Sequence, residues 1–237
     1  EFLNGIELSV FVLTDGSGYV ILPEAKDYKR IGDGDTGPNT GGMGAVSPVV
    51  FADSAFMQKI EDRVVKPTIA GLQKEGIDYK GFIFVGIMNV GGNPFVIEYN
   101  ARMGDPETQA VLLRIKSDFV ELLVAAAKGE LGSMKIDIDE HFAVTIALVS
   151  GGYPGEYVTG KVIQGLEHTG DAMVFHAGTR RNEETVQTQG GRVLAISAKG
   201  NSLSEARSNA YKTAAMINWD GMYYRKDIGL DLLNYKG

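Results

Sequence analysis

The chain has 237 residues, of which 44% are hydrophobic, and a formal net charge of −7. This length allows one large domain or two smaller ones, and the composition is that of an ordinary globular protein. The acidic balance gives no support for broad nucleic-acid binding, the lack of cysteine excludes disulfides and thiolate metal sites, and three scattered histidines disfavour a zinc site.

The beginning of the chain predicts neither an export signal nor a membrane span. The first residues, EFLNGIELSVFVL, begin with an acid and already alternate like a strand, and no apolar run approaches the length of a membrane span. The expected location is therefore cytoplasmic. Because the chain starts without Met and enters regular structure at once, we expect either a removed N-terminal part or a fragment of a longer protein.

Apolar spacing and turn residues predict regular elements along the first half. In chain order they are a strand over 6–13, its hairpin partner over 19–22, a helix from Asp53 or Ser54 to Gly76 with a kink or restart at Pro67, and a buried strand over 81–90. A turn at 91–93 leads from that strand into the next one, which predicts a second hairpin.

A glycine-rich segment, residues 31–44, reads IGDGDTGPNTGGMG and follows Lys29 and Arg30. Glycines let backbone N–H groups approach a ligand closely, so one interpretation is a loop that folds over an anionic ligand. The other is a flexible linker, although linkers are usually Ser-rich and repetitive. The segment is not a Walker phosphate loop, because no Gly-Lys-Ser/Thr follows it.

The stretch 96–109, VIEYNARMGDPETQ, predicts the site around which the chain is organised. Alternate side chains of a strand share a face, so Glu98, Asn100 and Arg102 are expected on one side, with the apolar residues between them as anchors. Carboxylate and amide oxygens suit Mg²⁺, and a guanidinium beside them can clamp an anion. We predict a metal–phosphate site here; the alternative is an edge strand with a polar outer face.

The rest of the chain predicts covering helices and a second domain. The helices begin at Pro106 and at Ser117 or Asp118, and the second ends near Gly129. A shift in composition at 132–140 places the domains at 1–133 and 134–237. The second domain is predicted to be small and α+β, without a catalytic constellation, and to contain strands over 142–149, 162–163, 173–176 and 193–197 and a helix with a Ser202/Glu205 capping box.

Several stretches, taken together and in order, resemble the phosphoribosylamine–glycine ligases, an ATP-grasp family. They include DYKRIGDGDTGPNTGGMGAVSP, VIEYNARMGDPETQ, SGGYPGEY and YRKDIG. The resemblance implies an α+β fold class: the C-terminal half of an ATP-grasp domain, with an antiparallel sheet and covering helices, followed by a small α+β C-terminal domain. It also implies that this piece lacks the first half of such an enzyme and is inactive alone.

The reaction implied by the resemblance uses ATP, glycine and 5-phosphoribosylamine, with Mg²⁺ or Mn²⁺, and passes through glycyl phosphate to glycinamide ribonucleotide. We expect a monomer with these small-molecule partners and with no nucleic-acid or membrane partner. Other possibilities are another ATP-grasp ligase or carboxylase, and a non-catalytic fragment that binds nucleotide or a partner protein.

The resemblance implies three groups of site residues. They are Glu98 and Asn100 as metal ligands with Arg102 as the catalytic arginine; Glu1, Phe2, Leu3 and Glu7 at the nucleotide; and Asp27, Lys29, Arg30 and Asp105 at the other substrates. The strand over 81–90 has no acid, so the protein is expected to supply two metal ligands and to leave the remaining positions to phosphates and water.

Overall fold

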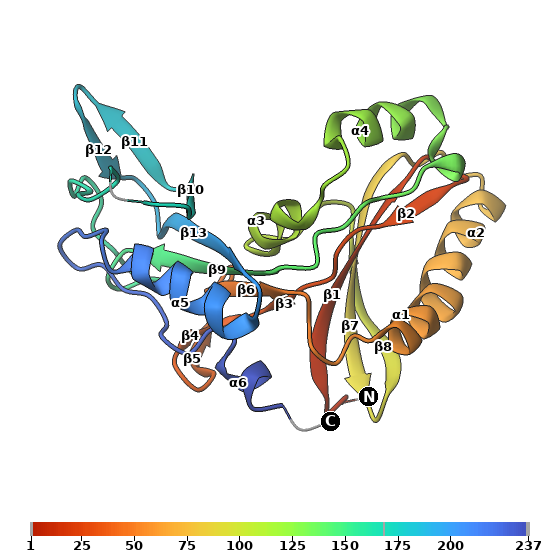
Figure 1. The fold of residues 1–237 in the computed structure, drawn as a ribbon, viewed down its shortest axis with the longest axis horizontal. Helices are drawn as coiled ribbons and strands as arrows, with labels where there is room; N and C mark the ends of the chain where they lie inside the picture. Colours follow the sequence, from red (N-terminus) through yellow and green to blue (C-terminus); the bar gives the residue numbers. More distant parts are fainter. Residues whose placement is uncertain (1, 168, 236–237) are drawn as a thin grey trace.

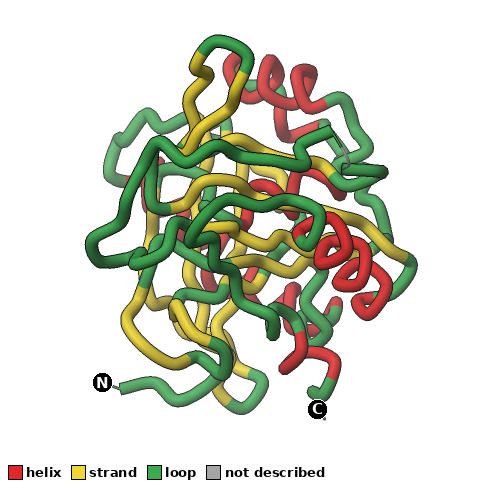
Figure 2. Tube along the Cα trace, turned by 90° about the vertical axis from the view of Figure 1, so that its left-hand side faces the viewer, coloured by secondary structure: helices red, strands yellow, loops and turns green. Residues whose placement is uncertain are grey.

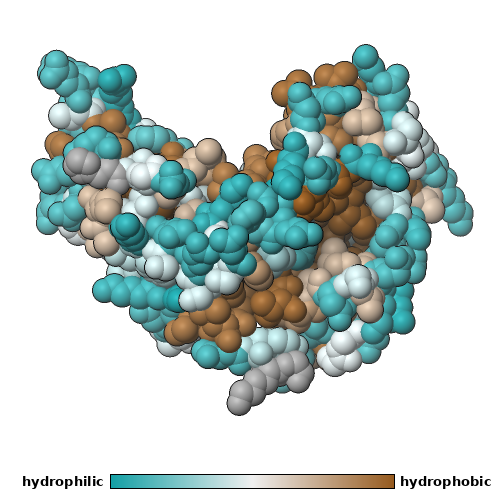
Figure 3. Space-filling view, viewed as in Figure 1, coloured by the Kyte–Doolittle hydropathy of each residue, from teal (hydrophilic) through white to brown (hydrophobic). Residues whose placement is uncertain are grey.

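The computed structural model describes residues 2–167 and 169–235. Two antiparallel sheets occupy separate arms of the molecule, with α3 (Glu107–Val111) between them (Figure 1). The space-filling view shows the surface hollowed between the arms (Figure 3). Among the described residues, no helix is long and apolar enough to cross a membrane.

The first sheet confirms the predicted strands and both hairpins. Its order is β2–β1–β7–β8, which are Tyr19–Ile21, Ile6–Thr14, Gly81–Val90 and Asn93–Asn100. Alternation along β1 sends Leu8 and Val10 into one apolar cluster and Phe11 and Leu13 into another, on the opposite face. The sheet is therefore covered on both sides.

One face of this sheet is covered by a continuous helical segment. It consists of α1 (Ser54–Ile60), a π-helical turn η1 (Glu61–Val65) and α2 (Lys66–Lys74). The Asp53 carboxylate caps α1 by accepting a hydrogen bond from the Phe56 N–H group, as predicted. Pro67 lies in the first turn of α2, directly after the π-helical turn, so the helix restarts there and the chain continues past it.

The other face is covered by α4 (Phe119–Lys128), whose Leu122 packs against the Phe11 cluster. Asp118 caps the start of α4, and Gly129 ends it in the left-handed conformation (φ 82°), which glycine adopts without steric cost. Two short 3₁₀ turns flank α4 in sequence, η2 (Leu112–Arg114) and η3 (Leu131–Ser133).

The second sheet combines strands from both halves of the chain. Its order is β10–β13–β9–β6–β3, which are Met173–His176, Arg192–Gly200, Phe142–Val149, Gly44–Ser47 and Lys26–Asp27. The helices of this half are α5 (Leu203–Ala214), which packs on β13 and β9, and α6 (Leu230–Leu233). Because β3 and β6 precede residue 133, the division at 133/134 does not coincide with the division between the sheets, and it stays a prediction.

Two local features differ from the predictions. Residues 162–163 form no strand; Val162 makes only an isolated bridge to Gln187. A hairpin of β11 (Thr179–Asn182) and β12 (Thr185–Thr188) was not predicted; it projects from the body in Figures 1 and 2. Its strands, TRRN and TVQT, contain one apolar residue, Val186, and so lack the apolar alternation that marks a half-buried strand.

The glycine-rich segment contains more regular secondary structure than either interpretation of it predicts. Part of it forms a hairpin of β4 (Arg30–Gly32) and β5 (Thr36–Asn39), and β6 follows. At the predicted capping box, Ser202 accepts a hydrogen bond from the Glu205 N–H group, but the Glu205 carboxylate accepts one from Asn201 rather than from Ser202.

Candidate functional site

Strand β8 displays Glu98 and Asn100 on the same face, as its alternation predicts. Glu98 lies opposite Gly86 of β7 and Asn100 lies opposite Phe84. A β-bulge shifts the register between Gly86 and Ile87, so that Val96 falls opposite Ile87. A Cβ atom at position 86 would lie 3.0 Å from Cγ of Glu98, so glycine there leaves room for the carboxylate side chain.

The apolar residues of β8 do not anchor the strand in the core, which corrects one expectation. Val96 is 37%, Ile97 45% and Tyr99 50% exposed. The anchoring comes from β7, which pairs with β8 along its length and whose Val85 and Ile87 are buried.

Most of the predicted site residues line one cavity of about 200 Å³, called here the central cavity. Metal, catalytic and substrate predictions meet there, together with groups from the glycine-rich segment and from the start of α3. The lining residues are Asp27, Lys29, Thr40, Gly41, Phe84, Glu98, Asn100, Arg102, Gly104, Asp105 and Glu107.

Lys29 connects the predicted nucleotide residue Glu7 to the predicted substrate residue Asp27. Its Nζ atom lies 2.5 Å from Oε2 of Glu7. Burial alone would lower the pKa of Lys29, but the negative charges of Asp27, Glu7 and Glu98 outweigh it and raise the pKa. Lys29 therefore remains a cation. It lies near Glu98 of β8, the strand that carries the predicted metal ligands.

The remaining predicted residues lie beside this cavity or away from it. Glu7 and Arg30 line a neighbouring cavity of about 420 Å³ that shares Asp27 and Lys29 with the central one. The Arg30 guanidinium donates to the Gly37 carbonyl, inside the β4–β5 hairpin. Phe2 is 93% exposed and Leu3 is half-buried, and Glu1 lies outside the described residues.

Asp105 is held by an arginine that the sequence did not single out. Arg192, from β13 of the second sheet, donates to the Asp105 carboxylate at 2.6 Å and to the Gly41 carbonyl at 2.5 Å. Gly42 lies directly against the segment that contains Asp105 and Pro106. Its φ is +112°, and a Cβ atom there would be 2.3 Å from Cδ of Pro106. The second half of the chain thus holds Gly41 and Asp105, which both line the central cavity.

Glu107 is the other residue that sequence reasoning missed. It is only 4% exposed, and the Ser9 hydroxyl on β1 donates to its Oε1 atom at 3.0 Å. Burial, and then the nearby Asp27 carboxylate, raise the pKa of Glu107 to about 7. Burial also raises the pKa of Asp27. In the sequence Glu107 looks like an ordinary acid in the first turn of a helix, so nothing local indicates its burial.

The donor set of β8 fits a magnesium or manganese ion with few protein ligands. Glu98 offers a carboxylate and Asn100 an amide carbonyl on one face, both lining the central cavity. In the described part of the chain, no three His, Cys, Asp or Glu side chains converge to hold a metal by themselves. The set therefore suits an ion that keeps water and substrate phosphates as its other ligands, which is the habit of Mg²⁺.

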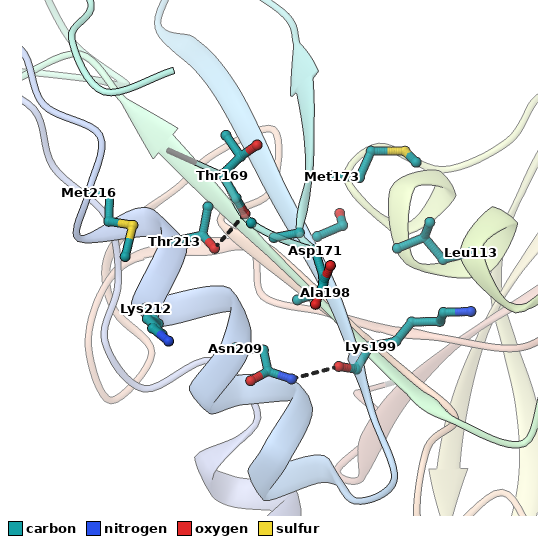
Figure 4. Close-up of a pocket in the computed structure, with 13 residues that line it drawn as sticks. Leu113, Thr169, Asp171, Met173, Ala198, Lys199, Asn209, Lys212, Thr213 and Met216 are labelled. Carbon is teal, nitrogen blue, oxygen red and sulfur yellow. Dashed lines mark hydrogen bonds between the residues drawn. The ribbon is translucent and has the colours of Figure 1, made fainter. Parts of the chain in front are cut away.

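A larger cavity of about 550 Å³ lies between α5, β10 and β13 (Figure 4). Its charged groups do not converge: Lys199 and Lys212 lie at opposite sides of the view. Lys199 is also paired with Asp139 at 2.8 Å. The smaller central cavity, where most of the predicted site residues meet, is therefore the candidate functional site.

Two family models match the chain. Residues 1–108 match the ATP-grasp (A) domain of phosphoribosylglycinamide synthetase, and residues 143–231 match its C domain. Phosphoribosylamine–glycine ligase of Chlorobaculum tepidum is 46% identical over 98% of this chain, and that of Escherichia coli K12 is 46% identical over 97%. The chain spans about half the length of these relatives, 55% and 54%.

Solved structures agree with the sequence comparison. A crystal structure of phosphoribosylamine–glycine ligase from Thermotoga maritima superposes with a TM-score of 0.87 at 39% identity, covering 96% of this chain and 56% of that one. The biotin carboxylase domain of a thermophilic 2-oxoglutarate carboxylase superposes with a TM-score of 0.68 over 99% of this chain and 51% of that one, at only 14% identity. The second likeness shows the fold alone, and the expected ATP-grasp fold class is confirmed.

Proposed function

The chain belongs to the phosphoribosylglycinamide synthetase family, and we propose that the protein that carries it joins glycine to 5-phosphoribosylamine in a reaction driven by ATP. The products are glycinamide ribonucleotide, ADP and phosphate. The observation that carries the proposal is the meeting of Glu98, Asn100 and Arg102 with Asp27 and Lys29 around one small cavity.

The chemistry has two steps. An oxygen of the glycine carboxylate attacks the γ-phosphorus of ATP, which releases ADP and leaves glycyl phosphate. The amine of 5-phosphoribosylamine then attacks the acyl carbon, the carbon–oxygen bond to phosphate breaks, and the amine loses a proton. Both steps move negative charge between phosphate and carboxylate oxygens, so positioning and charge neutralisation supply most of the catalysis.

The residues of the cavity divide this work. Glu98 and Asn100 would hold the divalent cation, Mg²⁺ or Mn²⁺, which supplies positive charge beside the phosphates. Arg102 lines the same cavity; its guanidinium, which donates to the Met103 carbonyl through Nη1, is proposed to donate to the glycine carboxylate and then to the acyl phosphate. Glu7 is proposed to accept hydrogen bonds from the ribose, and Lys29 keeps that carboxylate in place.

The test is an assay of ADP release by the protein as the cell makes it, with ATP, glycine and 5-phosphoribosylamine. We expect ADP only when glycine is present. Glu98→Gln keeps the size of the side chain but removes its charge, and it is expected to lower kcat by at least about 100-fold. The matched control is Glu184→Gln, at an exposed turn between β11 and β12, which should leave kcat unchanged.

Two results would contradict the proposal: ADP release that does not depend on glycine, or full activity of Glu98→Gln. A thermal-shift experiment with Mg-ATP adds an independent readout, because a ligand that binds only the folded state stabilises it. The shift should shrink in Glu98→Gln and persist in Glu184→Gln. Cytoplasmic location and a monomeric state stay predictions.

A further inference from the structure

Apart from the predicted metal ligand Glu98, the central cavity contains two carboxylates that lack a cationic partner. In the described part of the chain, neither Asp27 nor Glu107 has a lysine, arginine or histidine nitrogen within 4 Å; of the two lysines nearest to Asp27 in sequence, Lys26 is paired with Asp231 and Lys29 with Glu7. The only hydrogen bond from another side chain to Glu107 in that part of the chain comes from the Ser9 hydroxyl. Both side chains line the cavity. Burying a carboxylate without a cation costs free energy unless another group supplies the missing positive charge.

The burial of Glu107 is built into the fold. Its helix α3 packs between the two sheets and contacts β6, β9 and β13 (Figure 1). Gly104 makes space for the carboxyl group: a Cβ atom at that position would lie 2.7 Å from Cδ and Oε2 of Glu107. The raised pKa of Glu107, which burial and the charge of Asp27 produce, agrees with a pair of acids that an incoming cation would relieve.

A metal ion is a poor match for this cation. The predicted metal ligands Glu98 and Asn100 come from β8, whereas Glu107 comes from α3 and is tied to Ser9 of β1. An ammonium group needs only two or three acceptors at hydrogen-bond distance, which Asp27 and Glu107 can offer.

We propose that Glu107 and Asp27 hold the ammonium group of the glycine substrate, and that Arg102 faces its carboxylate. The proposal rests on the proposed function and adds an orientation to it. A zwitterion then lies across the cavity with its reactive carboxylate toward Arg102 and the metal face of β8, and with its ammonium group toward α3. Glu107 becomes a substrate-binding residue that fixes the direction of attack.

The test measures glycine saturation of the protein as the cell makes it, with ATP and 5-phosphoribosylamine saturating. Glu107→Gln keeps the shape and removes the charge. Because a hydrogen bond to a charged group contributes more than a neutral one, the KM for glycine should rise roughly 10- to 100-fold. The KM for ATP should change less than about twofold, and Glu184→Gln should change neither.

A second readout separates substrate contact from a merely structural role. Glycolate has the carboxylate of glycine but no ammonium group. Wild-type protein should bind glycine far more tightly than glycolate, measured by competitive inhibition, and Glu107→Gln should lose most of that preference. Asp27→Asn, at a less buried position, should shift the preference in the same direction and serves if Glu107→Gln does not fold.

Three outcomes would overturn the assignment while leaving the proposed function intact. They are an unchanged KM for glycine in both variants, an altered Mg²⁺ requirement with unchanged glycine binding, and an unchanged preference for glycine over glycolate. A wild-type protein that releases no ADP with glycine would instead refute the proposed function itself, so the two failures are distinguishable.

Discussion

Two groups of charged side chains meet the segment from residue 27 to residue 39, and they differ in how completely their charges are paired. The Arg225 cluster consists of Arg225, Asp35 and Asp227. The Arg225 side chain is 1% exposed, donates to both Asp227 oxygens at 2.8 and 2.7 Å, and donates to Asp35 at 2.6 Å. In the central cavity, by contrast, Glu107 has a single hydrogen bond from another side chain and no lysine, arginine or histidine nitrogen within 4 Å among the described residues.

The difference separates architecture from binding. The Arg225 cluster ties the C-terminal segment to the β4–β5 hairpin, since Arg225 also donates to the Arg30 carbonyl at 3.1 Å and Lys226 donates its N–H to Asp33. The charged groups that make these contacts all have partners within the chain. The charges of the central cavity are only partly satisfied, and substrates and metal are proposed to complete them. Fully paired buried charge indicates structure, and incompletely paired buried charge indicates a ligand.

The largest expected effect comes from breaking the complete cluster. Arg225→Met leaves Asp35 and Asp227 without their partner, and we expect the free energy of unfolding to fall by about 3–5 kcal/mol. Urea unfolding measures it. The control is Arg180→Met on the exposed β11–β12 hairpin, where the side chain makes one contact of 3.5 Å, and it should change stability by less than about 0.5 kcal/mol. Equal losses in both variants would contradict the comparison.

The next effect is a pH dependence that belongs to the central cavity. Burial and the Asp27 charge raise the pKa of Glu107 to about 7 in the folded state, against 4.5 for an unperturbed carboxyl group. The folded state therefore binds more protons between these values, so the stability that Glu107 contributes is present below about pH 4.5 and is lost as the pH rises through 7. The loss is on the order of 3 kcal/mol.

Glu107→Gln should remove this dependence, so its free energy of unfolding should fall less than that of the wild type between these pH values. Urea unfolding of both proteins below pH 4.5 and above pH 7 measures it. Parallel profiles would mean that the pKa of Glu107 is not raised in the folded state and that the charges in the central cavity already compensate one another.

The smallest effect has the opposite sign and belongs to the Arg225 cluster. Burial alone would raise the pKa of Asp227, but hydrogen bonds from Arg225 and Gly34 lower it to about 2, from 3.8. Its contribution to stability is therefore present above about pH 3.8 and is lost as the pH falls through 2. Allowing for the exposed part of the side chain, the contribution is about 1–2 kcal/mol. Acid unfolding of Asp227→Asn should be shallower than that of the wild type in this range.

The local parts of the site could be read from the sequence. Alternation put Glu98 and Asn100 on one face, and the pairing with Gly86 and Phe84 confirms it. Capping residues such as Asp53 and Asp118 marked helix starts within a residue, because a cap is a contact between neighbours in the chain. The same local rules failed for the β11–β12 hairpin, because its strands lack the alternation of apolar and polar residues by which a strand is predicted.

By itself the sequence determined the strands of the first sheet, the helix caps at Asp53 and Asp118, the shared face of Glu98 and Asn100 and the family motifs, because each depends on spacing within a few residues. Only the tertiary structure decided which charged side chains have a partner of opposite charge and which do not. Ser9 meets Glu107 across 98 positions, and Arg225 meets Asp35 across 190. Such contacts depend on how two sheets and a short helix pack, and no periodicity in the chain records that packing.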